Sequence, residues 1–132
     1  MTTRYSDHVF AVARIIFAFL YFCHGAQKLF GILGGYGTGG KPLFIAGGII
    51  EVVGGILIAV GLGTRIAAFI ASGEMAVAYF LFHAPHSFWP ILNHGEIVVA
   101  LCFFFLYVAA RGAGRLSLDA LLHRGPVSPS PQ

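Results

Sequence analysis

Four apolar segments, each long enough to cross a bilayer, fill most of this 132-residue chain. They are residues 9–30, 43–62, 66–82 and 91–110. A spanning helix needs about 20 mostly apolar residues, with a range of about 17–25. Only 10% of the residues are charged, whereas soluble domains have about 25%. The chain therefore lacks the charged surface that water requires, and we predict an integral membrane protein in contact with the lipid bilayer.

Short connections join the four segments. Residues 34–40 are rich in glycine, residues 63–65 allow only a tight turn, and residues 85–90 begin and end with proline. Short connections favour antiparallel neighbours, so the predicted fold is an all-α, up-down-up-down bundle of four transmembrane helices. We expect one domain over residues 1–124, with a short interfacial helix at 117–122. Residues 125–132 hold three prolines and two serines and are predicted to form a disordered tail.

The distribution of basic residues predicts the orientation. With four spans, both termini and the 63–65 turn lie on the same side of the membrane. An excess of Lys and Arg marks the cytoplasmic side, so we predict that both termini are cytoplasmic. The basic residues on that side are Arg4, Arg14, Arg65, Arg111, Arg115 and Arg124, against Lys28 and Lys41 on the other.

Charge and cysteine content exclude other classes of protein. The net charge is +3, but the basic residues are scattered singly, and no basic stripe indicates a nucleic-acid partner. Cys23 and Cys102 both lie inside apolar segments and have no CxxC spacing. Neither a disulfide framework nor a zinc site is therefore indicated.

Three glutamates fall within the predicted spans: Glu51, Glu74 and Glu96. An acid at the centre of a spanning helix costs roughly 2.5–3.5 kcal/mol on insertion scales. Each of these residues should therefore face the bundle interior, pair with a base or carry a proton. Glu51 shares its helix face with Gly47 and Gly54, and small residues mark close helix contacts in membranes. We expect Glu51 in the interior.

The first segment supplies the candidate bases. Arg14, Tyr21 and Lys28 are seven residues apart, with His24 between the last two, so all four line one helical stripe. We predict that Lys28 or His24 pairs with Glu51. Such a pair has a structural interpretation, in which it fixes helix register, and a functional one, in which it borders a polar cavity.

In the functional interpretation, one polar pocket opens to the extracytoplasmic side. Its predicted lining is His24, Lys28, Glu51, Glu74 and Glu96, and its predicted mouth is His83, Trp89, Asn93 and His94. A metal site is less favoured, because no HxxxH or ExxH pair lies on one helix. Haem is less favoured still, because nothing requires two histidines to face each other.

Five short motifs, in this order and spacing, resemble the DoxX family along nearly the whole chain up to Asp119. They are His24-Gly25-Ala26-Gln27-Lys28-Leu29, Ile50-Glu51-Val52-Val53-Gly54-Gly55, Gly61-Leu62-Gly63-Thr64-Arg65, Asn93-His94-Gly95-Glu96, and Gly112-Ala113-Gly114-Arg115-Leu116-Ser117-Leu118-Asp119. The resemblance implies a multi-pass protein of the bacterial cytoplasmic (inner) membrane. Relatives resemble the DoxD-type subunit of a thiosulfate:quinone oxidoreductase.

Three classes of function follow from these residues and this resemblance. The leading hypothesis is a redox-associated membrane subunit or accessory that contacts quinone or a sulfur compound. The chain carries no flavin or haem motif, so a redox partner protein is expected, and catalysis by this chain itself is left open. The alternatives are a small proton-coupled carrier that uses Glu51 and Glu74, and a membrane scaffold without chemistry of its own. The sequence is compatible with a homo-oligomer, and it names neither substrate nor cofactor beyond the candidate quinone.

Overall fold

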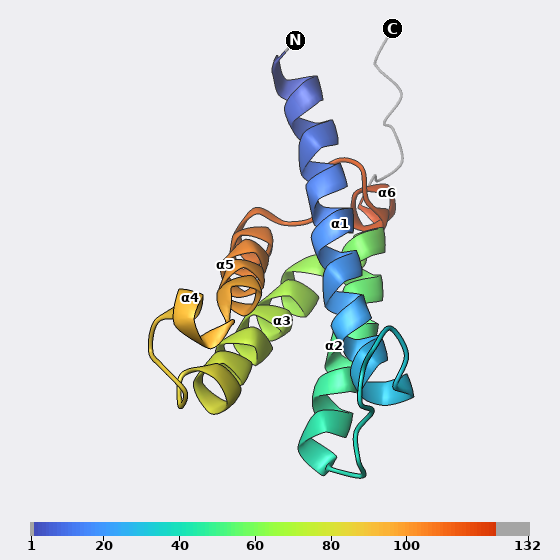
Figure 1. Ribbon diagram of the computed structural model, residues 1–132. Helices are drawn as coiled ribbons and strands as arrows, with labels where there is room; N and C mark the ends of the chain where they lie inside the picture. The colour runs from blue at the N-terminus through green and yellow to red at the C-terminus, as the bar shows by residue number, and fades with distance from the viewer. Residues whose placement is uncertain (1, 124–132) are drawn as a thin grey trace, which may run out of the picture.

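The computed structural model describes residues 2–123, and the predicted tail at 125–132 lies outside this range. The described chain is helical, which confirms the predicted all-α class (Figure 1). Its elements are α1 (Thr2–Phe30), α2 (Pro42–Val60), α3 (Thr64–Ala78), the π-helical turn η1 (Tyr79–His83), α4 (Pro90–Asn93), α5 (Glu96–Arg111) and α6 (Leu118–Leu122).

Within residues 2–123, three stretches are long and apolar enough to cross a membrane: Thr3–Phe30, Pro42–Val60 and Thr64–His83. The last one joins α3 to η1 without a break. The fourth long helix, α5, has 16 residues and is about 24 Å long at a rise of about 1.5 Å per residue. These helices make the chain a multi-pass membrane protein.

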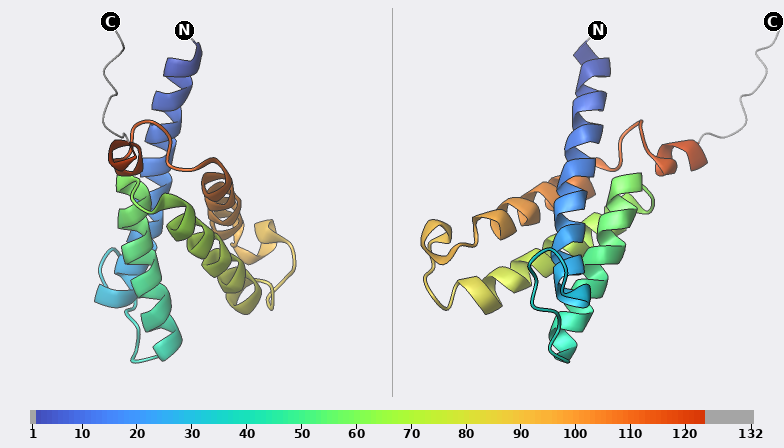
Figure 2. Two further views of the ribbon diagram at one scale, coloured as in Figure 1. Left: turned by 180° about the vertical axis from the view of Figure 1, so that it is seen from behind. Right: turned by 45° about the vertical axis from the view of Figure 1, so that its right-hand side comes forward.

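The long helices pack as two antiparallel pairs. α1 packs mainly against α2, and α3 packs mainly against α5. The two pairs lie close together near the turn between α2 and α3, and they diverge toward the opposite end (Figures 1 and 2). The start of α1 and the short helix α6 lie toward the same end of the molecule.

The contact between α1 and α2 is close because glycines form it. A Cβ atom added at Gly25 would lie 2.8 Å from the carbonyl oxygen of Gly48 and 2.8 Å from the backbone nitrogen of Val52. A Cβ added at Gly55 would lie 2.9 Å from the Cβ of Phe22. Small residues let helix backbones approach in this way in membranes.

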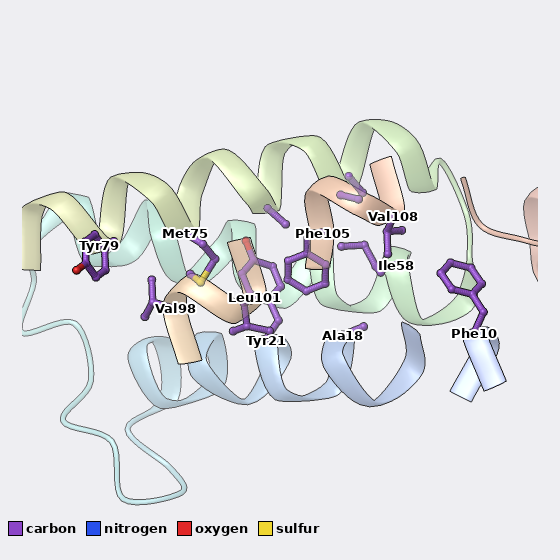
Figure 3. Close-up of a cluster of buried hydrophobic side chains, with 13 residues drawn as sticks. Phe10, Ala18, Tyr21, Ile58, Met75, Tyr79, Val98, Leu101, Phe105 and Val108 are labelled. Atoms are coloured by element: carbon purple, nitrogen blue, oxygen red, sulfur yellow. The ribbon is translucent and has the colours of Figure 1, made fainter. Parts of the chain in front are cut away.

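A buried apolar core joins the two pairs (Figure 3). Tyr21 of α1 meets Phe105 of α5 edge to face, with ring centroids 5.0 Å apart. Ile58 of α2 and Leu101 of α5 are fully buried in the same cluster. The core thus fixes how the α1–α2 pair sits against the α3–α5 pair.

The fourth predicted segment, 91–110, is not one continuous helix. The buried Asn93 side chain donates through Nδ2 to the Tyr79 hydroxyl at 3.1 Å and to the Ser87 carbonyl at 2.6 Å. Its Oδ1 accepts from the Gly95 backbone N–H at 2.8 Å. His94 takes a left-handed backbone conformation with φ 59°, which ends α4. The helix restarts as α5 at Glu96.

Arg14 is a fully buried hub at the end of the molecule where α6 lies. Its side chain is only 1% exposed. The guanidinium donates to the carbonyl of Ala113, to that of Leu116 at 2.9 Å and to that of Ala59 at 3.3 Å. Arg14 therefore ties the segment after α5 to α1 and α2.

Asp119 of α6 caps the start of α3. Its carboxylate accepts from the backbone N–H groups of Gly63 at 2.9 Å and Thr64 at 3.0 Å. Partial burial opposes ionisation of this carboxyl, but the hydrogen bonds from Thr64 and Gly63 outweigh it and hold the pKa of Asp119 below its usual value. The carboxylate compensates two N–H groups that α3 itself leaves unpaired.

We expect Asp119→Ala to lower the stability of the purified protein by about 1 kcal/mol at neutral pH, which is the usual worth of a helix cap. Because the folded-state pKa lies below the ordinary value of 3.8, the carboxylate stabilises fully above that value, and its contribution is lost as the pH falls through the folded-state pKa. Thermal unfolding against pH should show the two proteins converging at acidic pH. The control is Asp7→Ala, since Asp7 makes only long ion pairs of 3.6 and 3.8 Å. Equal stabilities of wild type and Asp119→Ala at neutral pH would contradict the capping role.

Candidate functional site

One lysine and two glutamates from three different helices meet inside the spanning region. Lys28 Nζ of α1 lies 2.7 Å from Glu51 Oε1 of α2 and 3.9 Å from Glu74 Oε1 of α3. The first contact is a charge-assisted hydrogen bond. Of the two bases proposed for Glu51 from the sequence, the structure places Lys28 against it. We refer to Lys28, Glu51 and Glu74 as the polar cluster.

Tyr21 adds a fourth polar group that was not among the predicted site residues. Its hydroxyl donates to Glu74 Oε2 at 3.1 Å, and the residue is completely buried. The signal was present in the sequence, since Tyr21 precedes Lys28 by seven residues on the same stripe. A tyrosine in an apolar segment is most simply interpreted as a packing residue. Only the structure, which places Glu74 beside it, shows that the Tyr21 hydroxyl has a polar partner.

The three members of the polar cluster differ in burial. The side chain of Glu51 is 1% exposed, that of Glu74 is 14% exposed and that of Lys28 is 28% exposed. Glu51 Oε2 is buried and has no hydrogen-bond partner among the described residues. The cluster therefore runs from a sealed carboxyl group at Glu51 to a more accessible carboxyl and ammonium at the other end.

Glycines on α2 place Lys28 beside Glu51. A Cβ added at Gly48 would lie 2.7 Å from Leu29 Cγ and 3.3 Å from Lys28 Cβ. A Cβ added at Gly47 would lie 3.5 Å from Glu74 Oε1 and 3.7 Å from Lys28 Nζ. The α2 backbone thus lies directly against the end of α1, which lets the lysine reach across to both carboxyl groups.

A cleft of about 310 Å³ lies between α2 and α3, next to the polar cluster. Lys28 and Glu74 form its polar wall, and the rest of its lining is apolar or glycine. Ile70, Val77 and Leu81 line the cleft and are also exposed, so the cleft opens at the surface of the spanning region. The full lining is Lys28, Leu43, Phe44, Ala46, Gly47, Ile50, Ile70, Gly73, Glu74, Val77, Ala78, Leu81 and Phe82.

Gly73 lies on the α3 wall of this cleft. It lies inside α3, where glycine costs about 1 kcal/mol relative to alanine, and a Cβ added there would meet nothing within 4 Å. No close helix contact therefore explains this glycine. At one end of the cleft, Phe44 and Phe82 stack with centroids 5.4 Å apart and ring planes 27° apart. The cleft thus combines a charged wall, an aromatic end and free space.

Three of the five predicted lining residues, Glu51, His24 and Glu96, are not part of the cleft lining, although Glu51 contacts Lys28, which is. His24 is half-buried on α1 and is not part of the lining. Glu96 is exposed in the first turn of α5, where an acid suits the helix dipole. Of the five predicted lining residues, the structure brings together Lys28, Glu51 and Glu74.

The four predicted mouth residues gather on the connection between α3 and α5. His83 Nδ1 lies 3.0 Å from the Asn93 carbonyl oxygen, and Asn93 itself holds the loop together. His94 is exposed. Trp89 lines a separate, wholly apolar cavity of about 350 Å³ together with Met75 and Phe103. None of the four lines the cleft beside the polar cluster.

Within residues 2–123, no group of three or more His, Cys, Asp or Glu side chains is arranged to hold a metal ion. The polar cluster offers two carboxyl groups and one ammonium. Groups of these types can donate and accept hydrogen bonds and can exchange protons.

Long apolar helices around a buried charged cluster define a multi-pass helical membrane protein. The DoxX family model matches residues 9–84, a range that contains Lys28, Glu51 and Glu74. This match covers more than half of the chain, and the protein belongs to the DoxX family, as its motifs suggested.

Two curated relatives align with most of the chain. An uncharacterised protein of Haemophilus influenzae is 41% identical in an alignment of length 123 that covers 88% of this chain and 92% of the relative. A Bacillus subtilis protein named "Putative oxidoreductase CatD" is 29% identical in an alignment of length 117 that covers 85% of each chain. No solved structure matches the sequence significantly.

Proposed function

We propose that this protein is a redox-associated membrane subunit that binds the ring of a lipid-soluble quinone in the cleft between α2 and α3. The observation that carries the proposal is the Lys28 ammonium, which Glu51 holds at 2.7 Å on the wall of an apolar cleft. An ammonium is a donor without acceptor capacity, and it suits a quinone carbonyl oxygen. Few other groups in a bilayer combine a carbonyl acceptor with a flat apolar ring.

The dimensions and lining of the cleft fit such a ring. A volume of about 310 Å³ falls at the lower end of the range for small-molecule sites, about 300–1,000 Å³. Phe44 and Phe82 supply an aromatic surface at one end. The exposed walls at Ile70 and Val77 would let a long apolar tail pass from the cleft into the lipid.

The name of the Bacillus subtilis relative supports the redox association. Because the sequence carries no flavin or haem motif, we propose that a partner protein exchanges electrons with the bound quinone. The chain then serves as the membrane subunit that holds the quinone. The same fold is compatible with a proton-coupled carrier, which the two carboxyl groups beside the cleft favour, and proton-driven flux in liposomes would identify that activity.

We also propose that the protein lies in the bacterial cytoplasmic membrane with both termini in the cytoplasm. The arginines at the end of the molecule that holds α6 support this orientation. A cysteine introduced at Gly37, in a variant without Cys23 and Cys102, should react with an impermeant thiol reagent from outside the cell. A cysteine at Thr3 should not, and the reverse pattern would overturn the orientation.

The decisive experiment fills the cleft. We expect Gly73→Leu to weaken binding of a short-chain ubiquinone analogue to the protein in nanodiscs by about tenfold or more, or about 1.4 kcal/mol. The leucine side chain would occupy the space that Gly73 leaves empty. Gly73→Ala is the matched control and should bind nearly as well as the wild type.

Binding is measured by titration of the quinone against intrinsic Trp and Tyr fluorescence. Thermal unfolding shows that each variant is folded. Equal quinone affinities for Gly73→Leu and the wild type would show that the quinone does not bind in the cleft. Absence of binding to the wild-type protein would remove the quinone proposal altogether.

A further inference from the structure

We infer that Glu51 and Glu74 together bind one exchangeable proton in the resting protein, so that the polar cluster is a proton-binding site. This inference deepens the proposed function, on which its role in redox chemistry rests, because Glu74 also lines the ligand cleft. Glu51 and Glu74 bind the proton, and this chain itself transfers no electrons in the proposal.

The charge count is the first argument. Two carboxyl groups lie around one ammonium, at 2.7 and 3.9 Å. With both carboxyl groups ionised, the cluster would carry one uncompensated negative charge, and an unpaired charge in a low-dielectric interior is strongly unfavourable. One proton shared by Glu51 and Glu74 makes the cluster neutral.

Hydrogen bonding is the second argument. Glu51 is almost completely buried, and its Oε2 has no hydrogen-bond partner among the described residues. A buried ionised oxygen without a donor is costly. Because the two carboxyl groups share one lysine, their protonation belongs to the pair and not to either residue alone.

Among the residues that the structure describes, the ion pairs of Glu51 and Glu74 involve Lys28 alone, with no second cation in place of the proton. From α1, Tyr21 is a neutral donor to Glu74 at 3.1 Å, and Lys28 is the cation already counted. His24 lies one turn before Lys28 on the same stripe, where a second positive charge would face the ammonium. From α5, the core beside Tyr21 consists of apolar side chains such as Leu101 and Phe105.

The proton is exchangeable because the cluster is open at one end. Glu74 is 14% exposed and Lys28 is 28% exposed, and both line the cleft. Water or a ligand in the cleft therefore reaches the Glu74 carboxyl directly, whereas Glu51 exchanges its proton through this neighbour. The cleft joins the proton site to the ligand site.

The test is infrared spectroscopy of the protein in nanodiscs without quinone at neutral pH. A protonated carboxyl group gives a C=O stretch that an ionised one lacks, and this band shifts in D₂O when the proton exchanges. We expect one such band in the wild type and its loss in both Glu51→Gln and Glu74→Gln, because one carboxylate then balances Lys28. We expect the band to double in Lys28→Met, where both carboxyl groups must be neutral.

Glu96→Gln is the matched control, since Glu96 is exposed and lies outside the cleft, and it should leave the band unchanged. Absence of the band in the wild type, or its persistence in both cluster glutamine variants, would overturn the inference. If Lys28→Met does not fold, the two glutamine variants still decide the question. If the wild type shows the band but binds no quinone, the proton site is supported and the quinone proposal is wrong. Failure of the inference and failure of the proposed function therefore give different results.

Discussion

Replacing Arg14 with methionine is expected to destabilise the protein by about 3–5 kcal/mol, because each buried carbonyl left without a donor costs about 1–3 kcal/mol. Arg14 is 1% exposed and donates to the carbonyls of Ala113, Leu116 and Ala59. A methionine fills much of the same space but supplies no donor. The segment that leads from α5 to α6 should therefore detach from α1 and α2.

Thermal unfolding of the detergent-solubilised protein, followed by circular dichroism, measures this effect. Arg115→Met is the matched control, since the Arg115 side chain is 75% exposed and its nearest Asp7 oxygen is 3.8 Å away. An exposed ion pair of this kind contributes about 0–1 kcal/mol. Similar unfolding temperatures for the two variants would show that the buried hydrogen bonds of Arg14 do not stabilise the fold.

Gly25→Ala should be the second most damaging change, with an expected loss of about 1–3 kcal/mol from overpacking. The added Cβ would lie 2.8 Å from two backbone atoms of α2, the Gly48 oxygen and the Val52 nitrogen. Backbone atoms of a helix cannot turn aside as a side chain can, so α1 and α2 must separate. That separation would also lengthen the 2.7 Å contact between Lys28 and Glu51.

The matched control for this change is Gly73→Ala, another glycine-to-alanine substitution inside a long helix. Apart from its chain neighbours and the nearby backbone of α3 itself, no atom of the described residues lies within 4 Å of the added Cβ, and alanine is favoured over glycine in helices by about 1 kcal/mol. The two substitutions should therefore shift the unfolding temperature in opposite directions. A shift of the same sign and size for both would mean that the close contact at Gly25 does not limit the packing of α1 on α2.

Hydropathy predicted most of the fold because the bilayer imposes its thickness on the sequence. The predicted segments 9–30, 43–62 and 66–82 each fall within one spanning stretch or extend it by one or two residues. The break at Asn93 was not predicted from the apolar segment 91–110. It depends on the left-handed backbone of His94 and on hydrogen bonds from Asn93 to Tyr79 and Ser87, none of which hydropathy encodes.

The candidate site was partly predictable for a similar reason. The cost of an acid in lipid and the glycines beside Glu51 indicated an interior carboxyl group with a base from the first helix. Whether His24 or Lys28 reached it depended on the rotation of α1 against α2, which glycine contacts at Gly25 and Gly48 determine. Glu96 falls within a predicted span, as Glu51 and Glu74 do, but the restart of the helix after His94 leaves it exposed.

The pairing of α1 with α2 has a consequence for how the chain enters the membrane during synthesis. Lys28 and Glu51 both belong to this first hairpin, so the hairpin holds a cation and its counter-ion before α3 has been made. A translocon would then release into lipid a unit in which the charges of Lys28 and Glu51 neutralise each other. Glu74 arrives later, with the second hairpin, and joins an ion pair that already exists. For Lys28, Glu51 and Glu74, the order along the chain thus matches the order in which their charges can be buried.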